Sequence, residues 1–231
     1  MRGESLEFLV AAVASAESNR RNRVRLLRVV EETIGVLMMS TAAASKGIST
    51  VRYVFDPTVS RFTVQAFATG LLSMFGHNPT IAIRDFDGGV EFIPGTYENA
   101  FVNMNVNTAT FEVLDEMKHN DREKLQDEMF DKVLDVARFS RAVFESNRIE
   151  VQSQTAPLVV HVDGQLNLRG VTQPHSFSAR VSHSDASLRI FGDFSLLLSD
   201  YGIRPVSVAG GALRLKDELK FRFEIVAKRD G

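Results

Sequence analysis

The sequence predicts an all-β domain: an antiparallel barrel, closed or nearly closed, or a sandwich, with about eight strands and one internal helix. Three observations support this class. From residue 51 onward, apolar and polar residues alternate with a period of two, as in strands with one buried face. Turn-forming residues separate these runs at the spacing of an antiparallel meander. The 17 Phe residues, against 3 Tyr and no Trp, indicate a large and dry interior.

The first 49 residues differ from the rest and predict a helical N-terminal extension. Apolar residues recur at helical spacing over about 5–17 and 22–39, and residues 41–49 are mostly small, as in a linker. We therefore divide the chain into an extension with its linker at 1–49 and a β-barrel domain at 50–231.

A faint export signal lies in the same region. The basic segment 20–25 precedes apolar residues and the small residues 42–44. Arg28, Glu31 and Glu32 interrupt the apolar part, where a signal peptide carries no charge. We therefore expect a cytoplasmic protein, with a periplasmic or secreted location as alternatives that stay open.

Charge and composition exclude several classes of protein. A net charge of −2 and a pI near 6.2 give no general attraction to nucleic acid, so we expect no nucleic-acid partner. No run of about 18 apolar residues is present, so we expect no transmembrane segment. The absence of cysteine excludes disulfides, thiolate metal sites and cysteine nucleophiles.

The strands can be assigned in order from the alternating runs. We place them at 51–55, 62–68, 81–83, 90–92, 102–106, 143–151, 158–168, 175–181, 188–198 and 219–227. Glycine-containing or polar turn signals separate them, and we place turns at 87–89, 162–164, 169–170, 184–186 and 210–211. Each strand is amphipathic, which predicts one face in the interior and one in water.

One helix is expected inside the domain, from about Asp121 to Leu134. Asn120 or Asp121 is a natural N-cap, because a short polar side chain can accept a hydrogen bond from the first turn. An apolar stripe follows at helical spacing: Leu125, Met129, Val133 and Leu134. We expect this stripe to pack on the sheet and the helix to cover one end or side of it.

The stretch 70–78 has the most unusual local chemistry, because glycines, a histidine and an asparagine lie among large apolar residues. This composition predicts a tight, partly buried corner. Ser73 and His77 could act as nucleophile and base, but no orienting carboxylate or oxyanion loop is identifiable. A structural role for His77, holding the corner through a backbone hydrogen bond, is the preferred interpretation.

Histidines elsewhere do not predict a metal centre. His161 and Asp163 share one face of a strand, and His175 and His183 share another face eight residues apart. This spacing is generic for strands, and no third ligand converges in the sequence. We therefore predict neither a metal site nor a cofactor.

Five segments in order make the pattern specific. They are YVFDP at 53–57, FGHN at 75–78, DFDG at 85–88, GQLNLRGVTQP at 164–174 and SDYGIRP at 199–205. With the expected helix between the third and the fourth, this succession resembles the YceI-like family of polyisoprenoid-binding proteins. Each segment alone is weak, but the order and spacing of all five extend across residues 51–228.

The resemblance implies an extended lipocalin-like barrel that binds or transports a long-chain isoprenoid or another lipid-like amphiphile, without catalysis. Such a ligand would be an isoprenoid quinone, a polyprenyl lipid or a fatty-acid derivative. The inward residues proposed to contact it are Phe62, Val64, Ile81, Ile83, Val102, Met104, Val106, Phe177, Phe194, Phe221 and Phe223. At the corner, Phe75, His77 and Asn78 would lie at the mouth, where the last two could meet a polar head group. For each, packing alone is an open alternative.

Two other functions stay open at this point. The first is an enzyme that acts on a hydrophobic substrate with His77 as general base. The second is a stress-related module with a solid barrel core, whose basic N-terminal helix binds a partner protein. A homodimer is possible in each case.

Overall fold

The alternating segments form one antiparallel sheet of 12 strands in the computed structural model, which describes residues 49–69, 78–95, 97, 99–205, 207–208 and 213–231. The chain order is β1 (Val51–Phe55), β2 (Arg61–Thr69), β3 (Thr80–Ile83), β4 (Phe86–Phe92), β5 (Phe101–Asn107), β6 (Phe111–Val113), β7 (Arg141–Ser153), β8 (Leu158–Leu168), β9 (Val171–His183), β10 (Ser187–Leu197), β11 (Ser207–Val208) and β12 (Leu213–Arg229). The predicted extension and the corner up to residue 77 lie outside the described residues, so both stay predictions.

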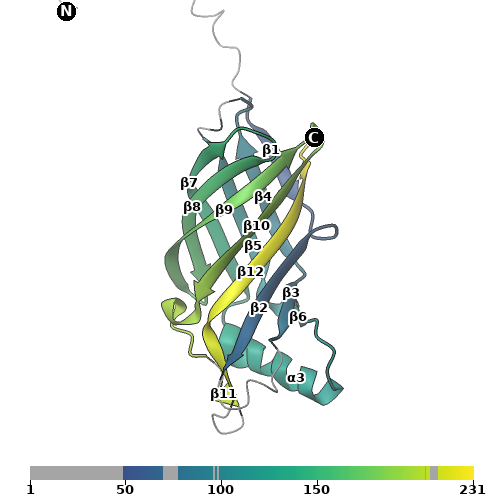
Figure 1. Cartoon of the computed structure of the whole chain (residues 1–231), viewed down its shortest axis with the longest axis vertical. Coiled ribbons are helices and arrows are strands. Elements are labelled where there is room, and N and C mark those ends of the chain that lie inside the picture. Colours follow the sequence, from purple (N-terminus) through teal and green to yellow (C-terminus); the bar gives the residue numbers. More distant parts are fainter. Residues whose placement is uncertain (1–48, 70–77, 96, 98, 206, 209–212) are drawn as a thin grey trace, which may run out of the picture. The chain divides into compact units, whose positions relative to one another are not determined.

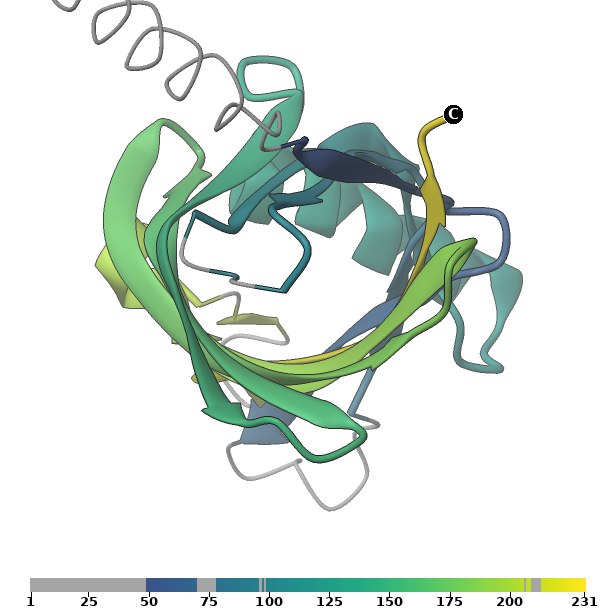
Figure 2. The ribbon, with the colours of Figure 1, turned by 90° about the horizontal axis from the view of Figure 1, so that it is seen from above.

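Eight of these strands close into a barrel. The order is β1-β4-β5-β7-β8-β9-β10-β12, and β12 pairs back with β1 to complete the ring (Figures 1 and 2). Alternation of apolar and polar residues lets every strand turn one face inward, and closure removes the unpaired edges of an open sheet. The predicted all-β barrel is confirmed, and the sandwich is excluded.

β12 holds the two ends of the ring together. One edge pairs with β10 along the whole of that strand. The other edge is shared, because β1 pairs with the last residues of β12 and β2 pairs with the part below. β1 and β2 therefore follow one another along β12 as two halves of one broken strand.

The break between β1 and β2 is a bend organised by Asp56. Its carboxylate accepts hydrogen bonds from the backbone N–H of Thr58 at 3.0 Å and from its hydroxyl at 2.5 Å. Lys228 of β12 pairs with the same carboxylate at 2.5 Å. Ser60 Oγ donates to the Asp56 carbonyl at 2.6 Å and accepts from the Val226 N–H at 2.9 Å. These bonds attach the bend to β12 where its edge passes from one partner strand to the next.

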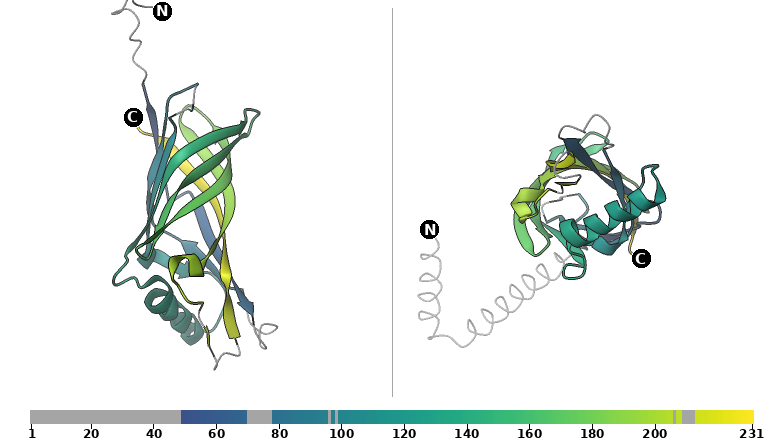
Figure 3. Two further views of the ribbon diagram at one scale, coloured as in Figure 1. Left: turned by 90° about the vertical axis from the view of Figure 1, so that its left-hand side faces the viewer. Right: turned by 90° about the horizontal axis from the view of Figure 1, so that it is seen from below.

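A helix covers the lower end of the barrel, where β3 and β6 extend the sheet from β2 (Figures 1 and 3). It consists of α3 (His119–Glu128) and the π-helical stretch η3 (Met129–Leu134). The predicted stripe is confirmed, because its residues pack with apolar side chains of β2, β3 and β6. The predicted cap is wrong: Lys118 is the N-cap and makes no side-chain cap bond.

The turn predicted at 87–89 is also wrong, because these residues lie within β4. A Cβ on Gly88 would lie 2.2 Å from the carbonyl oxygen of Asn103 in β5, and one on Gly89 would lie 2.3 Å from that of Tyr53 in β1. The glycines therefore permit close approach of both neighbouring strands. The turn predicted at 162–164 fails for a similar reason, since Gly164 lies within β8 under the ring of Phe144.

The remaining turn predictions have mixed outcomes. Arg169 and Gly170 join β8 to β9 with φ values of 53° and 77°, as a two-residue hairpin turn with two left-handed positions requires. The hairpin at 184–186 joins β9 to β10, as predicted. Residues 210–211 lie outside the described part of the chain.

We expect Gly89→Ala to lower the free energy of unfolding by about 2–3 kcal/mol, because its Cβ would overlap the backbone of β1. Urea denaturation measures this value. Glu91→Ala on the same strand is the control, since its exposed carboxylate is 3.5 Å from Arg52 and its loss should cost less than about 1 kcal/mol. Equal stability of the two variants would contradict the proposed close contact of β1 and β4.

The Asp56 bend predicts a specific acid sensitivity. Hydrogen bonds from Lys228 and Thr58 lower the pKa of the Asp56 carboxyl to about 2. Its unfolded pKa is about 3.9, so the stabilisation is complete above that value and is lost as pH falls toward 2. We expect the melting temperature of the wild type to fall more steeply between pH 4 and pH 2 than that of Asp56→Asn.

Asp185→Asn serves as the control for this measurement, because Asp185 is exposed in the β9–β10 hairpin. It should keep the wild-type acid profile. Identical profiles for wild type and Asp56→Asn would show that the bend does not contribute to the acid sensitivity.

Candidate ligand cavity

The barrel encloses a cavity of about 280 Å³. Strands around the whole ring contribute to its wall, and Leu125 of α3 and Met129 of η3 contribute from the lower end. The lining is almost entirely apolar: among the described residues, its titratable side chains are Glu128, His175, His183 and Tyr97, with no Lys or Arg. Such a wall suits an apolar chain and offers no positive charge to an anion.

Most of the predicted ligand-contact residues lie in this wall. They are Phe62, Val64, Ile81, Ile83, Val102, Met104, Val106, Phe177, Phe194, Phe221 and Phe223. Phe75 and His77 lie outside the described residues. Asn78 is exposed, whereas the next residue, Pro79, lines the cavity. Contact with a ligand stays a prediction for each.

Several of the lining phenylalanines also pack on one another. Phe194 stacks on Phe221 with centroids 4.7 Å apart and planes 3° from parallel. Phe177 meets Phe223 edge to face at 5.8 Å, and Phe62 meets Phe223 in the same way at 6.1 Å. These residues therefore hold the wall together as well as face the interior.

The prediction omitted other parts of the wall. Phe144, Val160, Val162 and Leu166 of β7 and β8 line the cavity, and the alternation of their strands carries the signal that identifies them. Tyr97, in the loop between β4 and β5, also lines the cavity and packs on Phe92, with the ring centroids 5.6 Å apart. A loop residue has no periodic signal, so the sequence pattern did not indicate it.

The polar side chains of the wall have different surroundings. The Glu128 carboxylate accepts a hydrogen bond from Lys132 Nζ at 2.8 Å, so the two side chains form an ion pair. His183 Nε2 lies 3.2 Å from the hydroxyl of Tyr53, at hydrogen-bond distance. The Nε2 atom of His175 is buried and has no hydrogen-bond partner among the described residues. Burial also lowers the pKa of His175, so its ring is neutral at neutral pH.

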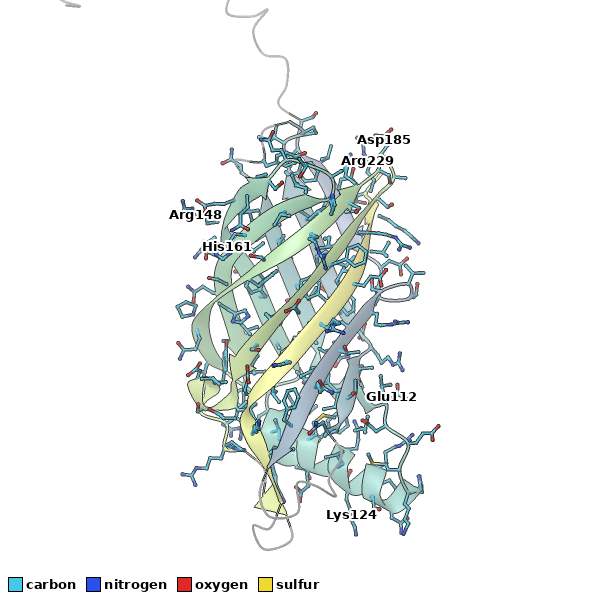
Figure 4. The ribbon with its side chains drawn as sticks, in the orientation of Figure 1. Glu112, Lys124, Arg148, His161, Asp185 and Arg229 are labelled. Atoms are coloured by element: carbon cyan, nitrogen blue, oxygen red, sulfur yellow. The ribbon has the colours of Figure 1, made fainter. Side chains whose placement is uncertain are left out.

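A second group of polar residues lies on the outer face of β8 and β9, and Figure 4 labels one of them, His161. His161 Nε2 is 3.3 Å from Asp163 Oδ1, and its Nδ1 is 3.4 Å from the Ser178 hydroxyl. A hydrogen bond from Ser176, at 2.6 Å, lowers the pKa of Asp163. Ser178, His161 and Asp163 thus resemble a nucleophile, a base and an orienting carboxylate. They lie on ladder-paired strands outside the cavity, however.

The described residues show neither a metal cluster nor a membrane-spanning helix. No three of the His, Asp and Glu side chains in the described ranges gather as a metal site would require. Likewise, none of the helices described is both long and apolar enough to span a membrane.

Comparisons with known proteins agree with this geometry. Residues 53–227 match the family described as YceI-like domain. Burkholderia cenocepacia BcnA has 18% sequence identity and a TM-score of 0.60, with 75% of this chain and 99% of that chain covered. A polyisoprenoid binding domain from Saccharophagus degradans, implicated in plant cell wall breakdown, has 14% identity and a TM-score of 0.56, with 77% and 98% covered.

A third similar structure is the Campylobacter jejuni YCEI protein, with 12% identity, a TM-score of 0.52, and 68% of this chain and 88% of that chain covered. At these identities the structures establish a shared fold. A search of curated proteins found no match.

We expect Ala179→Phe to weaken binding of an apolar fluorophore, N-phenyl-1-naphthylamine, by roughly 10- to 100-fold. Ala179 is 3% exposed and lines the cavity, so a larger side chain takes space from the ligand. Excluding two or three methylene-sized groups of the ligand from the cavity makes the free energy of binding less favourable by about 2 kcal/mol. A fluorescence titration measures the affinity.

Ser178→Phe is the matched control, because Ser178 precedes Ala179 on β9 and is exposed on the outer face. It should leave the affinity unchanged, and circular dichroism should show both variants folded. Equal binding by folded Ala179→Phe would show that the fluorophore does not enter the barrel.

Proposed function

The chain belongs to the YceI-like domain family, and on that premise we propose that it is a non-catalytic carrier of a long-chain isoprenoid or a similar amphiphile. Family membership confirms the resemblance drawn from the five sequence segments. The observation that carries the proposal is the cavity of about 280 Å³, whose described wall is nearly all apolar. A polyisoprenoid binding domain with a similar fold supports the choice of ligand.

The energetics favour a long and flexible apolar ligand. Each buried methylene contributes about 0.8 kcal/mol of gross transfer free energy. Several isoprene units therefore offset the cost of immobilising the chain, without any polar contact. The wall supplies aromatic and branched side chains from all around the ring, which surround such a chain with dispersion contacts.

The arrangement of the cavity supports binding without catalysis. In the described lining, no Ser, Thr, Cys or Lys stands beside His175 or His183 as a nucleophile would. His183 is engaged with Tyr53, and Glu128 with Lys132. The enzyme alternative rests on His77, outside the described residues, and no observation on the described part favours it.

The test is to identify what the protein carries. We expect protein purified from its own host to release, on denaturation and solvent extraction, an apolar chain of tens of carbons detectable by mass spectrometry. Ala179→Phe purified in the same way should release at least several-fold less, and Ser178→Phe the same amount as wild type. Wild-type protein that carries no lipid and binds no apolar chain added to it would overturn the proposal.

A further inference from the structure

The ladder between β9 and β10 is incomplete. The two strands pair from Leu188↔His183 down to Gly192↔Ala179, and no pair follows below in the described residues. Yet residues 171–178 of β9 remain paired with β8, and residues 193–197 of β10 remain paired with β12. Two strand edges therefore face each other without a ladder in the lower half of the barrel, and we call this region the β9–β10 seam.

A polar hollow of about 350 Å³ lies at the seam. Its polar lining comprises Gln173, His175, Ser195, Asp200, Tyr201 and Glu218. The 3-10 helix η4 (Leu198–Tyr201) borders it, and the Gln173 side-chain amide donates to the Asp200 carbonyl at 3.0 Å. His175 and Leu196 line both this hollow and the apolar cavity, so they form the wall between the two.

His175 brings an unmet hydrogen-bonding group to this wall. Its ring lies edge-on to Phe194 with centroids 4.8 Å apart, and its buried Nε2 has no partner among the described residues. A buried polar atom without a hydrogen bond is unfavourable, so a ligand that supplies one gains affinity there. His183 differs, because its Nε2 already lies within hydrogen-bond distance of Tyr53.

The charges around His175 restrict the chemistry of that ligand group. The charged residues of the hollow are Asp200 and Glu218, both acidic, and the described lining of the apolar cavity has no Lys or Arg. A phosphate or carboxylate would therefore lack a counter-charge and meet negative ones. An ammonium group would find counter-charges in Asp200 and Glu218, but to reach the buried Nε2 beside Phe194 it would have to give up its water, and desolvating a charge is costly.

We propose, building on the carrier function above, that the polar end of the ligand lies at the β9–β10 seam. There the Nε2 of His175 makes a hydrogen bond to an uncharged carbonyl or hydroxyl oxygen, while the apolar chain lies in the cavity. The seam thus selects amphiphiles with a neutral oxygen-containing end over anionic ones.

The first experiment compares probes that share a 16-carbon chain and differ at one end. The wild-type protein with bound N-phenyl-1-naphthylamine is titrated separately with hexadecane, hexadecan-2-one, hexadecan-1-ol, hexadecanoate and hexadecylamine, and the loss of fluorescence gives the affinity of each. We expect the ketone or the alcohol to bind roughly 3- to 10-fold more tightly than hexadecane and hexadecanoate. This is the gain in affinity that one buried hydrogen bond contributes. The ketone can only accept this bond, so its gain would identify Nε2 as the donor.

Two variants locate the gain. His175→Leu should abolish it, so that the ketone and the alcohol bind to this variant no more tightly than hexadecane does, with no drop in the melting temperature of the ligand-free protein. His183→Leu, the matched control at the other cavity-lining histidine, should keep it. A gain that survives in His175→Leu, or tighter binding of hexadecanoate or hexadecylamine than of both neutral probes, would overturn the proposal.

The same titration separates this proposal from the carrier function. If hexadecane and all its derivatives fail to bind, the carrier function fails. If all bind equally well, the carrier function stands and the role of His175 is wrong.

A second experiment tests the position of the polar end without altering His175. The chain has no cysteine, so Ser195→Cys at the seam and Ser182→Cys on the ladder-paired part of β9 each introduce one thiol. We expect saturating hexadecan-2-one to slow maleimide labelling at position 195 at least 3-fold and to leave position 182 unaffected. Equal effects at the two positions would contradict a polar end at the seam.

Discussion

The whole barrel depends on strand β12 pairing along both of its edges. One edge pairs with the whole of β10, from Glu218 to Lys228 of β12, and the other is divided between β1 and β2. This division is possible because the Asp56 bend lets the chain leave one half of the broken strand and enter the next beside β12. With the ring closed, every inward face meets the others across one interior, and the apolar cavity follows from that closure.

An interior of this kind makes each buried polar group conspicuous. Apolar side chains, most of them phenylalanine, valine, leucine or isoleucine, form nearly the whole described wall, so a polar atom there finds few partners. Thr108 and Ser146 are buried, but each is satisfied by backbone: Thr108 donates to the Phe139 carbonyl, and Ser146 accepts from the Val102 N–H. His175 is not satisfied in this way, and it lies where the sheet itself is incomplete.

Alternation along the chain is sufficient to predict much of this structure, because the period of two assigns each strand residue to a face. Phe221 and Phe223 could be placed inside from their alternation with Lys220 and Arg222 alone. The role of glycines was not predictable in the same way. Gly88 and Gly89 have the composition of a turn, and their place within β4 depends on contacts with two distant strands.

The site was less predictable than the fold for a related reason. Nothing in the sequence of β9 shows that its pairing with β10 stops at Ala179, since both strands keep their alternation beyond that point. The significance of His175 therefore depends on the registers of the β8–β9, β9–β10 and β10–β12 ladders, which the sequence does not show. The helix cap was missed because Lys118, rather than the polar residues after it, adopts the extended conformation that precedes the first turn.

The unequal lengths of the ladders have a mechanical consequence. β12 is joined to β10 by 11 residue pairs but to β1 by only 3. Because the β1–β12 ladder is the shortest in the ring, we expect it to open first under tension applied across the barrel or in a thermal fluctuation. Closure of the barrel thus depends on the short ladder between β1 and β12, and the ion pair between Asp56 and Lys228 lies beside that ladder.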